Sequence, residues 1–229
     1  MSEEFSGFPA QGLEFLAELG RSDKAWFTEH RKTYDRHVVA PTKAFVETIG
    51  SRLSAAISPT ISAQPKTNGS IAPINNDLRF SPDKPPYKDH LLLRFWDGPD
   101  KKTAPSLMIR IAQDEIGFSS GAAITDNTRW RELIDDNTNG QALVAALDAL
   151  GDIPDLDVAD DRLKNVPTPY PADHPRSDLL RNRGIFHVRW PEPTPPTIHT
   201  TDFVDHCTER LEQCRDLHHW FLNNLSAPT

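Results

Sequence analysis

The amino-terminal part of the chain shows apolar residues at helical spacing. Between residues 9 and 57 they recur every three or four positions, in three runs separated by Gly20 and Pro41. Such spacing places the apolar side chains on one face of a helix. Glycine favours a helix end and proline a helix start. We therefore predict three helices over about residues 9–57, the second of them capped by Ser22.

From about residue 69 the periodicity changes to two, which is typical of strands. The pattern predicts a strand-rich centre over about residues 69–120. Short strands are predicted at 91–96, 107–111, 116–119 and 185–190. In the second of these, one face is aliphatic and Arg110 lies on the other. This arrangement is typical of a strand with one face on the core and the other toward solvent or a cavity.

The remainder of the chain is predicted to consist of helices joined by irregular segments. Residues 125–196 combine helical runs with a stretch rich in proline and aspartate. A long amphipathic helix is expected at about residues 201–225, with its apolar stripe at Phe203, Cys207, Leu211, Cys214, Leu217, Phe221 and Leu225. Helices at both ends of a run of strands indicate an α+β fold. We predict a single domain, residues 1–229, with the N-terminal and C-terminal helices packed on a central, mainly antiparallel sheet.

Composition narrows the classes of partner. The chain has 229 residues and a formal net charge of −8 at pH 7, which argues against general binding to nucleic acid or to anionic membranes. The start of the chain is acidic and lacks an apolar signal region, and no run of about 18 apolar residues occurs. We therefore expect a cytoplasmic protein that does not enter a membrane. The composition does not indicate whether the protein has a protein partner.

Neither the cysteines nor the histidines indicate a metal site. Cys207 and Cys214 are seven positions apart in one predicted helix, a separation of about 10 Å that is beyond disulfide reach. We expect both to be reduced core residues. The 9 histidines include no His-Glu-x-x-His, and the chain has no Cys-x-x-Cys. The sequence thus predicts no metal and no cofactor.

The densest chemistry lies in residues 75–91, where acidic, basic, phenolic and imidazole side chains are interleaved with prolines. Prolines at positions 82, 85 and 86 exclude a helix and stiffen the segment. Holding many charges in a stiff loop costs desolvation, which partners or a ligand must offset. We interpret residues 77–90 as a candidate site. Its functional groups are Asp77, Arg79, Asp83, Lys84, Tyr87, Lys88 and His90.

Two functions fit this loop. In the first, the protein binds or turns over a small anionic molecule that bears phosphate or carboxylate. The anion would be clamped by the cations of the loop, Arg79, Lys84 and Lys88. His90 or Tyr87 would move a proton, and Asp77 or Asp83 would orient the base.

A second basic segment adds to this interpretation. Residues 162–189 carry more arginine and lysine than aspartate, in a chain that is acidic overall. Arg181 and His187 in this segment are further candidates for ligand binding. We hypothesise that the 77–90 loop and the 181–189 strand form opposite walls of one polar cleft.

The second function is a non-catalytic module for protein interaction. The loop charges would then pair with one another as a structural network, Tyr87 would be a core aromatic, and Asp89 a solvated charge. The proline-rich connector at 191–196 would face a protein partner. Trp96 and Trp190 would be exposed aromatic side chains that face the same partner.

The loop also carries a resemblance to a known family. Residues 78–91 read Leu-Arg-Phe-Ser-Pro-Asp-Lys-Pro-Pro-Tyr-Lys-Asp-His-Leu, which resembles the R-F-S-x-D-K-x-P-Y-K-x-H-L signature of an uncharacterised bacterial family, a domain of unknown function. Segments 163–167 and 170–175 also fit that family. The resemblance covers nearly the whole chain and implies one domain but no particular activity. Family members typically carry arginines where this chain has Pro73 and Asn76, so the resemblance implies two fewer positive contacts for an anion.

Overall fold

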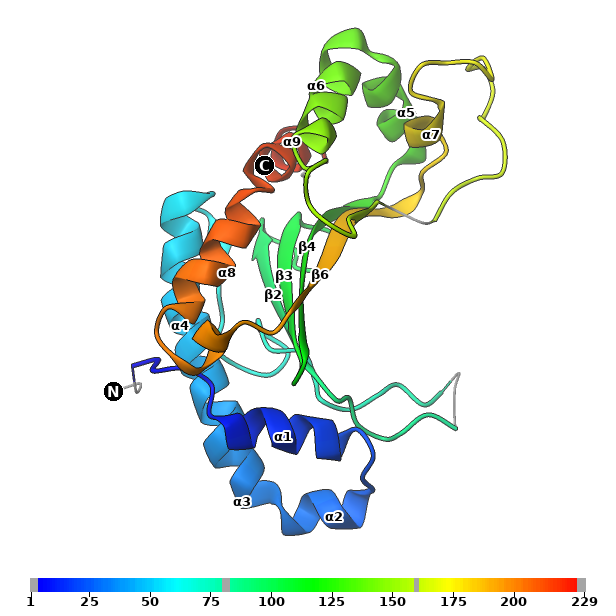
Figure 1. Cartoon of the computed structure of the whole chain (residues 1–229). Helices are drawn as coiled ribbons and strands as arrows, with labels where there is room; N and C mark the ends of the chain where they lie inside the picture. The colour runs from blue at the N-terminus through cyan, green and yellow to red at the C-terminus, as the bar shows by residue number, and fades with distance from the viewer. Residues whose placement is uncertain (1–3, 80–82, 159–160, 226–229) are drawn as a thin grey trace. The chain divides into compact units, whose positions relative to one another are not determined.

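The computed structural model describes residues 4–79, 83–158 and 161–225 and shows an α+β fold (Figure 1). This part of the chain contains one antiparallel sheet with the strand order β1-β2-β3-β4-β6-β5. The strands are β1 (Ile61–Ser62), β2 (Leu91–Asp97), β3 (Ser106–Ile111), β4 (Glu115–Ile124), β5 (Asp157–Val158) and β6 (Gly184–Pro193). The predicted fold class is therefore confirmed. The four predicted strands correspond to β2, β3, β4 and β6.

Contacts between residues divide the chain into two compact units. Unit 1 comprises residues 1–95, 108–118 and 191–210, and unit 2 comprises residues 96–107, 119–190 and 211–229. Each unit contains its own buried aromatic residues, Phe45 among them in unit 1 and Trp130 in unit 2. The extent of the predicted single domain, residues 1–229, stays a prediction.

The N-terminal helices belong to unit 1. Helix α1 (Ala10–Leu19) begins after Pro9 and ends at Gly20, as predicted. The second predicted helix is divided into two short ones, α2 (Lys24–Glu29) and α3 (Arg31–Tyr34). The prediction that Ser22 caps α2 is wrong. The cap is Asp23, because its carboxylate accepts the backbone N–H of Trp26 at 2.9 Å.

A π-helix, Asp35–Val39, leads directly into α4 (Ala40–Ala56). Its cause lies in Pro41, which has no N–H and so cannot bond to the carbonyl group four residues before it. The widened turn accommodates this missing hydrogen bond. The apolar face predicted for the third helix is buried, at Phe45, Ile49, Leu53 and Ile57.

The core of unit 1 is an aromatic cluster. The rings of Phe5 and Phe8 lie 5.0 and 5.5 Å from the ring of Phe45 on α4. Phe203 is the first residue of α8 (Phe203–Glu212), and its ring stacks on that of Phe45 with the ring centres 5.4 Å apart. Aromatic pairs of this kind contribute about 0.5–1.5 kcal/mol beyond the burial of their area. As a result α8 runs alongside α4 (Figure 1).

The core of unit 2 is centred on Trp130. This residue lies on α5 (Asn127–Asp135), which is followed by α6 (Asn137–Asp148), and the C-terminal α9 (Arg215–Leu225) contacts α6 (Figure 1). The ring of Trp130 lies 5.2 Å from that of Phe186 on β6 and 5.8 Å from that of Trp220 on α9. Its indole N–H donates to the carbonyl of Leu179 on the short α7 (Ser177–Leu180) at 2.8 Å.

The prediction of one continuous C-terminal helix is wrong. The helix is interrupted between α8 and α9, where the N–H of Cys214 bonds to the carbonyl of Leu211, three residues back. No glycine or proline marks this tightened turn in the sequence. The predicted apolar stripe is nevertheless buried at six of its seven positions, and only Leu225 is half-buried. None of the helices in the described residues has both the length and the apolar character needed to cross a lipid bilayer.

Candidate functional site

The 77–90 loop is closed by hydrogen bonds between its two arms. The side-chain amide of Asn76 donates to the carbonyl groups of Pro85 and Tyr87, both at 2.9 Å. The backbone N–H of Asn76 donates to the carbonyl of Pro86, also at 2.9 Å. Asn76 is one of the two positions where the resembled family typically has arginine, and here it fixes the shape of the loop.

The ammonium group of Lys88 has the same role. It donates to the backbone carbonyl of Pro73 at 2.5 Å and to that of Asn75 at 2.7 Å. Partial burial lowers the pKa of this ammonium group. Two of its three N–H donors are therefore used within the loop. These contacts hold the loop together, and the anion contact expected of Lys88 stays a prediction.

Arg79 and Asp77 form a surface ion pair. A guanidinium N–H of Arg79 lies 2.6 Å from a carboxylate oxygen of Asp77, and both side chains are exposed. The hydrogen bonds from Arg79 lower the pKa of Asp77. Exposed pairs of this kind add little to stability. Asp83 and Lys84 are exposed at the loop tip, and residues 80–82 of the signature lie outside the described residues.

Tyr87 is part of the core of unit 1. Its side chain is 6% exposed, and its ring lies 4.7 Å from that of Phe27 on α2. Tyr87 is therefore a core aromatic residue, as the second of the two interpretations expects. We do not assign proton transfer to it.

His90 lies in a cluster of polar and charged groups on β3 and β4 and directly before β2. His90 and Asp89 directly precede β2, Arg110 lies on β3, and Glu115 begins β4. The Nδ1 atom of His90 is 2.6 Å from Oδ1 of Asp89 and 3.5 Å from Nη2 of Arg110. Nη1 of Arg110 donates to Oε1 of Glu115 at 2.8 Å. We call these four residues the His90 cluster.

The two contacts of Nδ1 indicate the tautomer of His90. The 2.6 Å contact is much shorter than the 3.5 Å contact, so we assign the proton to Nδ1, which donates to Asp89. The Nε2 atom then keeps its lone pair. Burial lowers the pKa of His90, the hydrogen bond with Asp89 partly opposes this, and the charge of Arg110 lowers the pKa further. His90 is therefore neutral at pH 7 and can accept a proton.

A cavity of about 470 Å³ lies beside the His90 cluster in unit 1. Its charged lining residues are Arg21, Asp89, Arg110, Asp114 and Glu115. The end of α1 closes one side, where a Cβ added at Gly20 would lie 2.6 Å from the Cβ of Asp89. Only glycine permits this approach, which fixes the carboxylate of Asp89 next to the cavity.

The two candidates from the second basic segment lie in unit 2. Nε of Arg181 donates to the carbonyl of Leu163 at 2.8 Å, and its Nη1 lies 3.2 Å from a carboxylate oxygen of Asp178. His187 lies on β6, where a Cβ added at Gly121 of the neighbouring β4 would be 2.7 Å from the Cβ of His187. The cleft between the 77–90 loop and the 181–189 strand stays a prediction.

The aromatic residues required by the interaction-module hypothesis are not exposed. Trp96 is 6% exposed and Trp190 is 2% exposed. The ammonium group of Lys101 also lies 5.2 Å from the centre of the Trp96 ring. Neither indole can therefore present an aromatic surface to a partner. This part of the prediction is wrong, because Trp96 on β2 and Trp190 on β6 both occupy positions whose side chains are buried.

Of the His90 cluster, the sequence identified only His90 as a site residue, and Asp89, Arg110 and Glu115 were missed. Asp89 was interpreted as a solvated charge; its side chain is 58% exposed, and it also accepts a hydrogen bond from His90. Arg110 was placed on the polar face of its strand without a role. The signal that could have identified it was the single charge in an otherwise aliphatic strand. Within residues 4–79, 83–158 and 161–225, no group of three or more His, Cys, Asp or Glu side chains could hold a metal ion.

Comparison with known proteins identifies the family but no activity. A family model described as "Conserved hypothetical protein (DUF2461)" matches residues 11–220. No curated protein and no solved structure matches the chain. Because the family model spans most of the sequence, the chain belongs to the DUF2461 family of conserved hypothetical proteins.

Proposed function

We propose that this protein binds a small anionic ligand, bearing phosphate or carboxylate, in the cavity beside the His90 cluster, and that His90 transfers a proton to or from it. One observation carries the proposal. Arg110 is one of the residues that line a cavity of about 470 Å³, and its Nη2 atom lies 3.5 Å from Nδ1 of His90, which is itself not among the lining residues. A guanidinium group suits planar, bidentate recognition of carboxylate or phosphate.

The other lining residues refine the ligand. Arg21 provides a second cation, and its guanidinium group pairs with Glu18 at 2.7 Å. The carboxylates of Asp114 and Glu115 accept hydrogen bonds, so we expect the ligand to carry hydroxyl or amine donors next to its anionic group. Phosphorylated or carboxylated polyols meet both requirements.

The proposed proton transfer uses the pair formed by His90 and Asp89. The carboxylate of Asp89 accepts a hydrogen bond from the Nδ1–H group of His90, so Nε2 of His90 is the nitrogen that can act as the base. The expected orienting residue was Asp77 or Asp83, but the carboxylate that contacts His90 is Asp89. The lowered pKa of His90 keeps the imidazole neutral at pH 7, as a general base requires.

A thermal-shift screen tests the proposal. Inorganic phosphate, sugar phosphates, nucleotides and hydroxy acids are added to the wild type, and a ligand at 100 times its Kd adds about 2.7 kcal/mol to stability. The Arg110→Gln variant should lose this stabilisation. Arg129→Gln removes one exposed positive charge from α5 and should keep it. Equal stabilisation of the wild type and the Arg110→Gln variant would exclude the His90 cluster as the site.

The non-catalytic alternative retains one supporting observation. Asn76 and Lys88 make hydrogen bonds that close the loop on itself, as a structural network would. Such a network needs no ligand.

We also propose that the protein is cytoplasmic, of bacterial origin and not a general nucleic-acid binder.

A further inference from the structure

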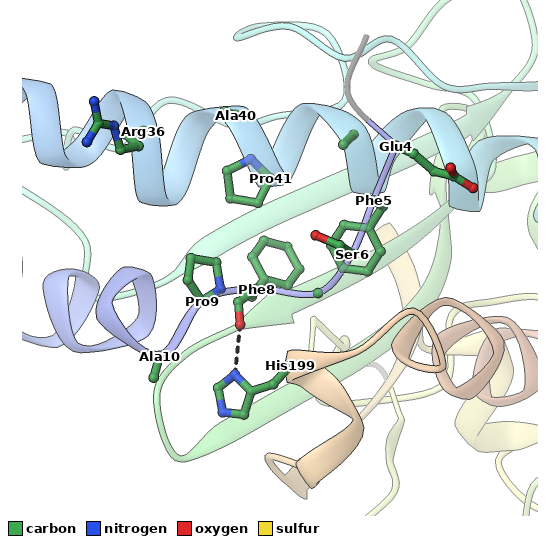
Figure 2. Close-up of a pocket in the computed structure, with 12 residues that line it drawn as sticks. Glu4, Phe5, Ser6, Phe8, Pro9, Ala10, Arg36, Ala40, Pro41 and His199 are labelled. Carbon is green, nitrogen blue, oxygen red and sulfur yellow. Dashed lines mark hydrogen bonds between the residues drawn. The ribbon is translucent and has the colours of Figure 1, made fainter.

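Unit 1 contains a second cavity, of about 440 Å³, that shares no lining residue with the first (Figure 2). We call it the N-terminal cavity. It lies between the extended segment 4–9 and the junction of the π-helix with α4, and its lining includes Arg36, Ala40, Pro41 and His199. Its volume is within the range of about 300–1,000 Å³ that is usual for small-molecule sites.

The walls of the N-terminal cavity are held by specific contacts. The Nδ1–H of His199 donates to the carbonyl of Phe8 at 2.7 Å (Figure 2), and the N–H of Phe8 donates to the carbonyl of Ile198 at 2.8 Å. Gly7 has a φ of +111°, and a Cβ there would lie 2.2 Å from the carbonyl carbon of His199. Segment 4–9 is thus fixed in place, so the cavity exists before any ligand binds.

The middle of the cavity is apolar. Pro9 and Pro41 lie on opposite sides of it, the ring of Phe8 lies beside Pro9 (Figure 2), and Ala40 and Ala44 complete this part of the lining. The rigid proline rings and the small alanine side chains leave room for an apolar group. Burial of such a group would be favourable by about 25 cal/mol for each Å² removed from water.

The two ends of the cavity carry opposite charges. Arg36 lies at one end and Glu4 at the other (Figure 2). Both side chains are exposed, and neither has an ion-pair partner among the residues that the structure describes. Arg36 is on the π-helix that Pro41 imposes, and such turns are frequent at functional sites. An anionic group would be attracted to Arg36 and repelled from Glu4.

We propose that the N-terminal cavity binds a small monocarboxylic acid with an apolar body. The carboxylate pairs with the guanidinium group of Arg36, and the apolar body lies between Pro9 and Pro41. A dicarboxylic acid is disfavoured, because its second charge would approach Glu4. This site is independent of the proposed function, because it uses none of the residues of the His90 cluster.

The test is a titration with benzoate, followed by NMR through the methyl signals of Ala40 and Ala44. We expect saturable shifts of these signals in the wild type. Arg36→Gln should weaken benzoate binding about tenfold or more, because it removes a charge-assisted contact. Lys43→Gln removes an exposed charge from the same helix, outside the cavity, and should leave the affinity unchanged.

Three further comparisons test the specificity of the N-terminal cavity. Benzyl alcohol, which lacks the charge, and glutarate, which carries two, should both bind more weakly than benzoate. In Arg110→Gln the methyl signals of Ala40 and Ala44 should respond to benzoate as in the wild type, even if this variant loses the anionic ligand proposed for the His90 cluster. Equal affinity of the wild type and Arg36→Gln for benzoate, or the absence of saturable shifts at millimolar benzoate, would overturn the proposal.

Discussion

The Nδ1 atom of His90 and the Oδ1 atom of Asp89 lie 2.6 Å apart, although the two residues are consecutive in the chain. In a strand, consecutive side chains point to opposite faces of the sheet. Here both residues lie in a bend just before β2, so their side chains can meet. The close packing of Gly20 against Asp89 holds this bend in place. The pair therefore depends on a helix that lies about seventy residues earlier in the sequence.

The lowered pKa of His90 predicts how stability changes with pH. As the pH falls below about 6.5, the unfolded chain takes up a proton at this position before the folded protein does. The stability that neutral His90 contributes is complete above that pH and is lost as the pH falls toward the lowered value. The melting temperature of the wild type should thus fall more steeply between pH 7 and pH 5 than that of His90→Gln. Parallel curves for the two proteins would show that His90 does not have a lowered pKa.

Lys88 and Lys84 should differ in their effect on the fold. Lys88→Ala removes two hydrogen bonds to backbone carbonyls and should cost about 1–3 kcal/mol of unfolding free energy. Lys84→Ala, a change at an exposed position, should stay within about 0.5 kcal/mol of the wild type. Urea denaturation measures both. If the two variants were equally stable, the contacts of Lys88 would not hold the loop.

Leu211 should be one of the core residues on which the fold depends. It is fully buried at the end of α8, and Leu211→Ala should cost about 2–5 kcal/mol. Leu222→Ala, at a half-buried position on α9, should cost less. Denaturant unfolding of both variants provides the comparison. An unchanged midpoint for Leu211→Ala would contradict the packing described for α8.

The two cysteines should be unreactive in the folded protein. Burial raises the pKa of Cys214 to about 12 and raises that of Cys207 well above its ordinary value. Since the thiolate is the reactive form, neither residue should react with a thiol reagent at pH 8. Both should react after denaturation. Rapid modification of the native protein would mean that the C-terminal helices open readily.

The helices and strands could largely be predicted, because burial on one face leaves a periodic pattern in the sequence. The aliphatic alternation of residues 107–111 identified β3, and the spacing from Phe45 to Ile57 identified α4. The break between α8 and α9 could not be predicted in this way. It arises from a tightened turn at Cys214, where the sequence contains neither glycine nor proline.

The partners of the charged residues were harder to predict than their positions. The candidate loop was identified by its prolines and mixed charges, but Arg110 reaches His90 only because β2 and β3 are neighbours in the sheet. Lys88 has carbonyl partners that carry no side-chain signal at all. Tertiary structure decides whether a charge binds a ligand or closes a loop. That choice is not encoded in the local pattern.

The most direct test of the proposed function follows the ring nitrogens of His90 by NMR while an anion is titrated. The probe is the phosphate or carboxylate compound that gives the largest thermal shift, and Arg129→Gln serves as the charge-matched control. We predict saturable shifts of the His90 ring signals in the wild type and in Arg129→Gln, and their loss in Arg110→Gln. Ring signals of His90 that stay unchanged while the ligand stabilises the protein would contradict a site at the His90 cluster.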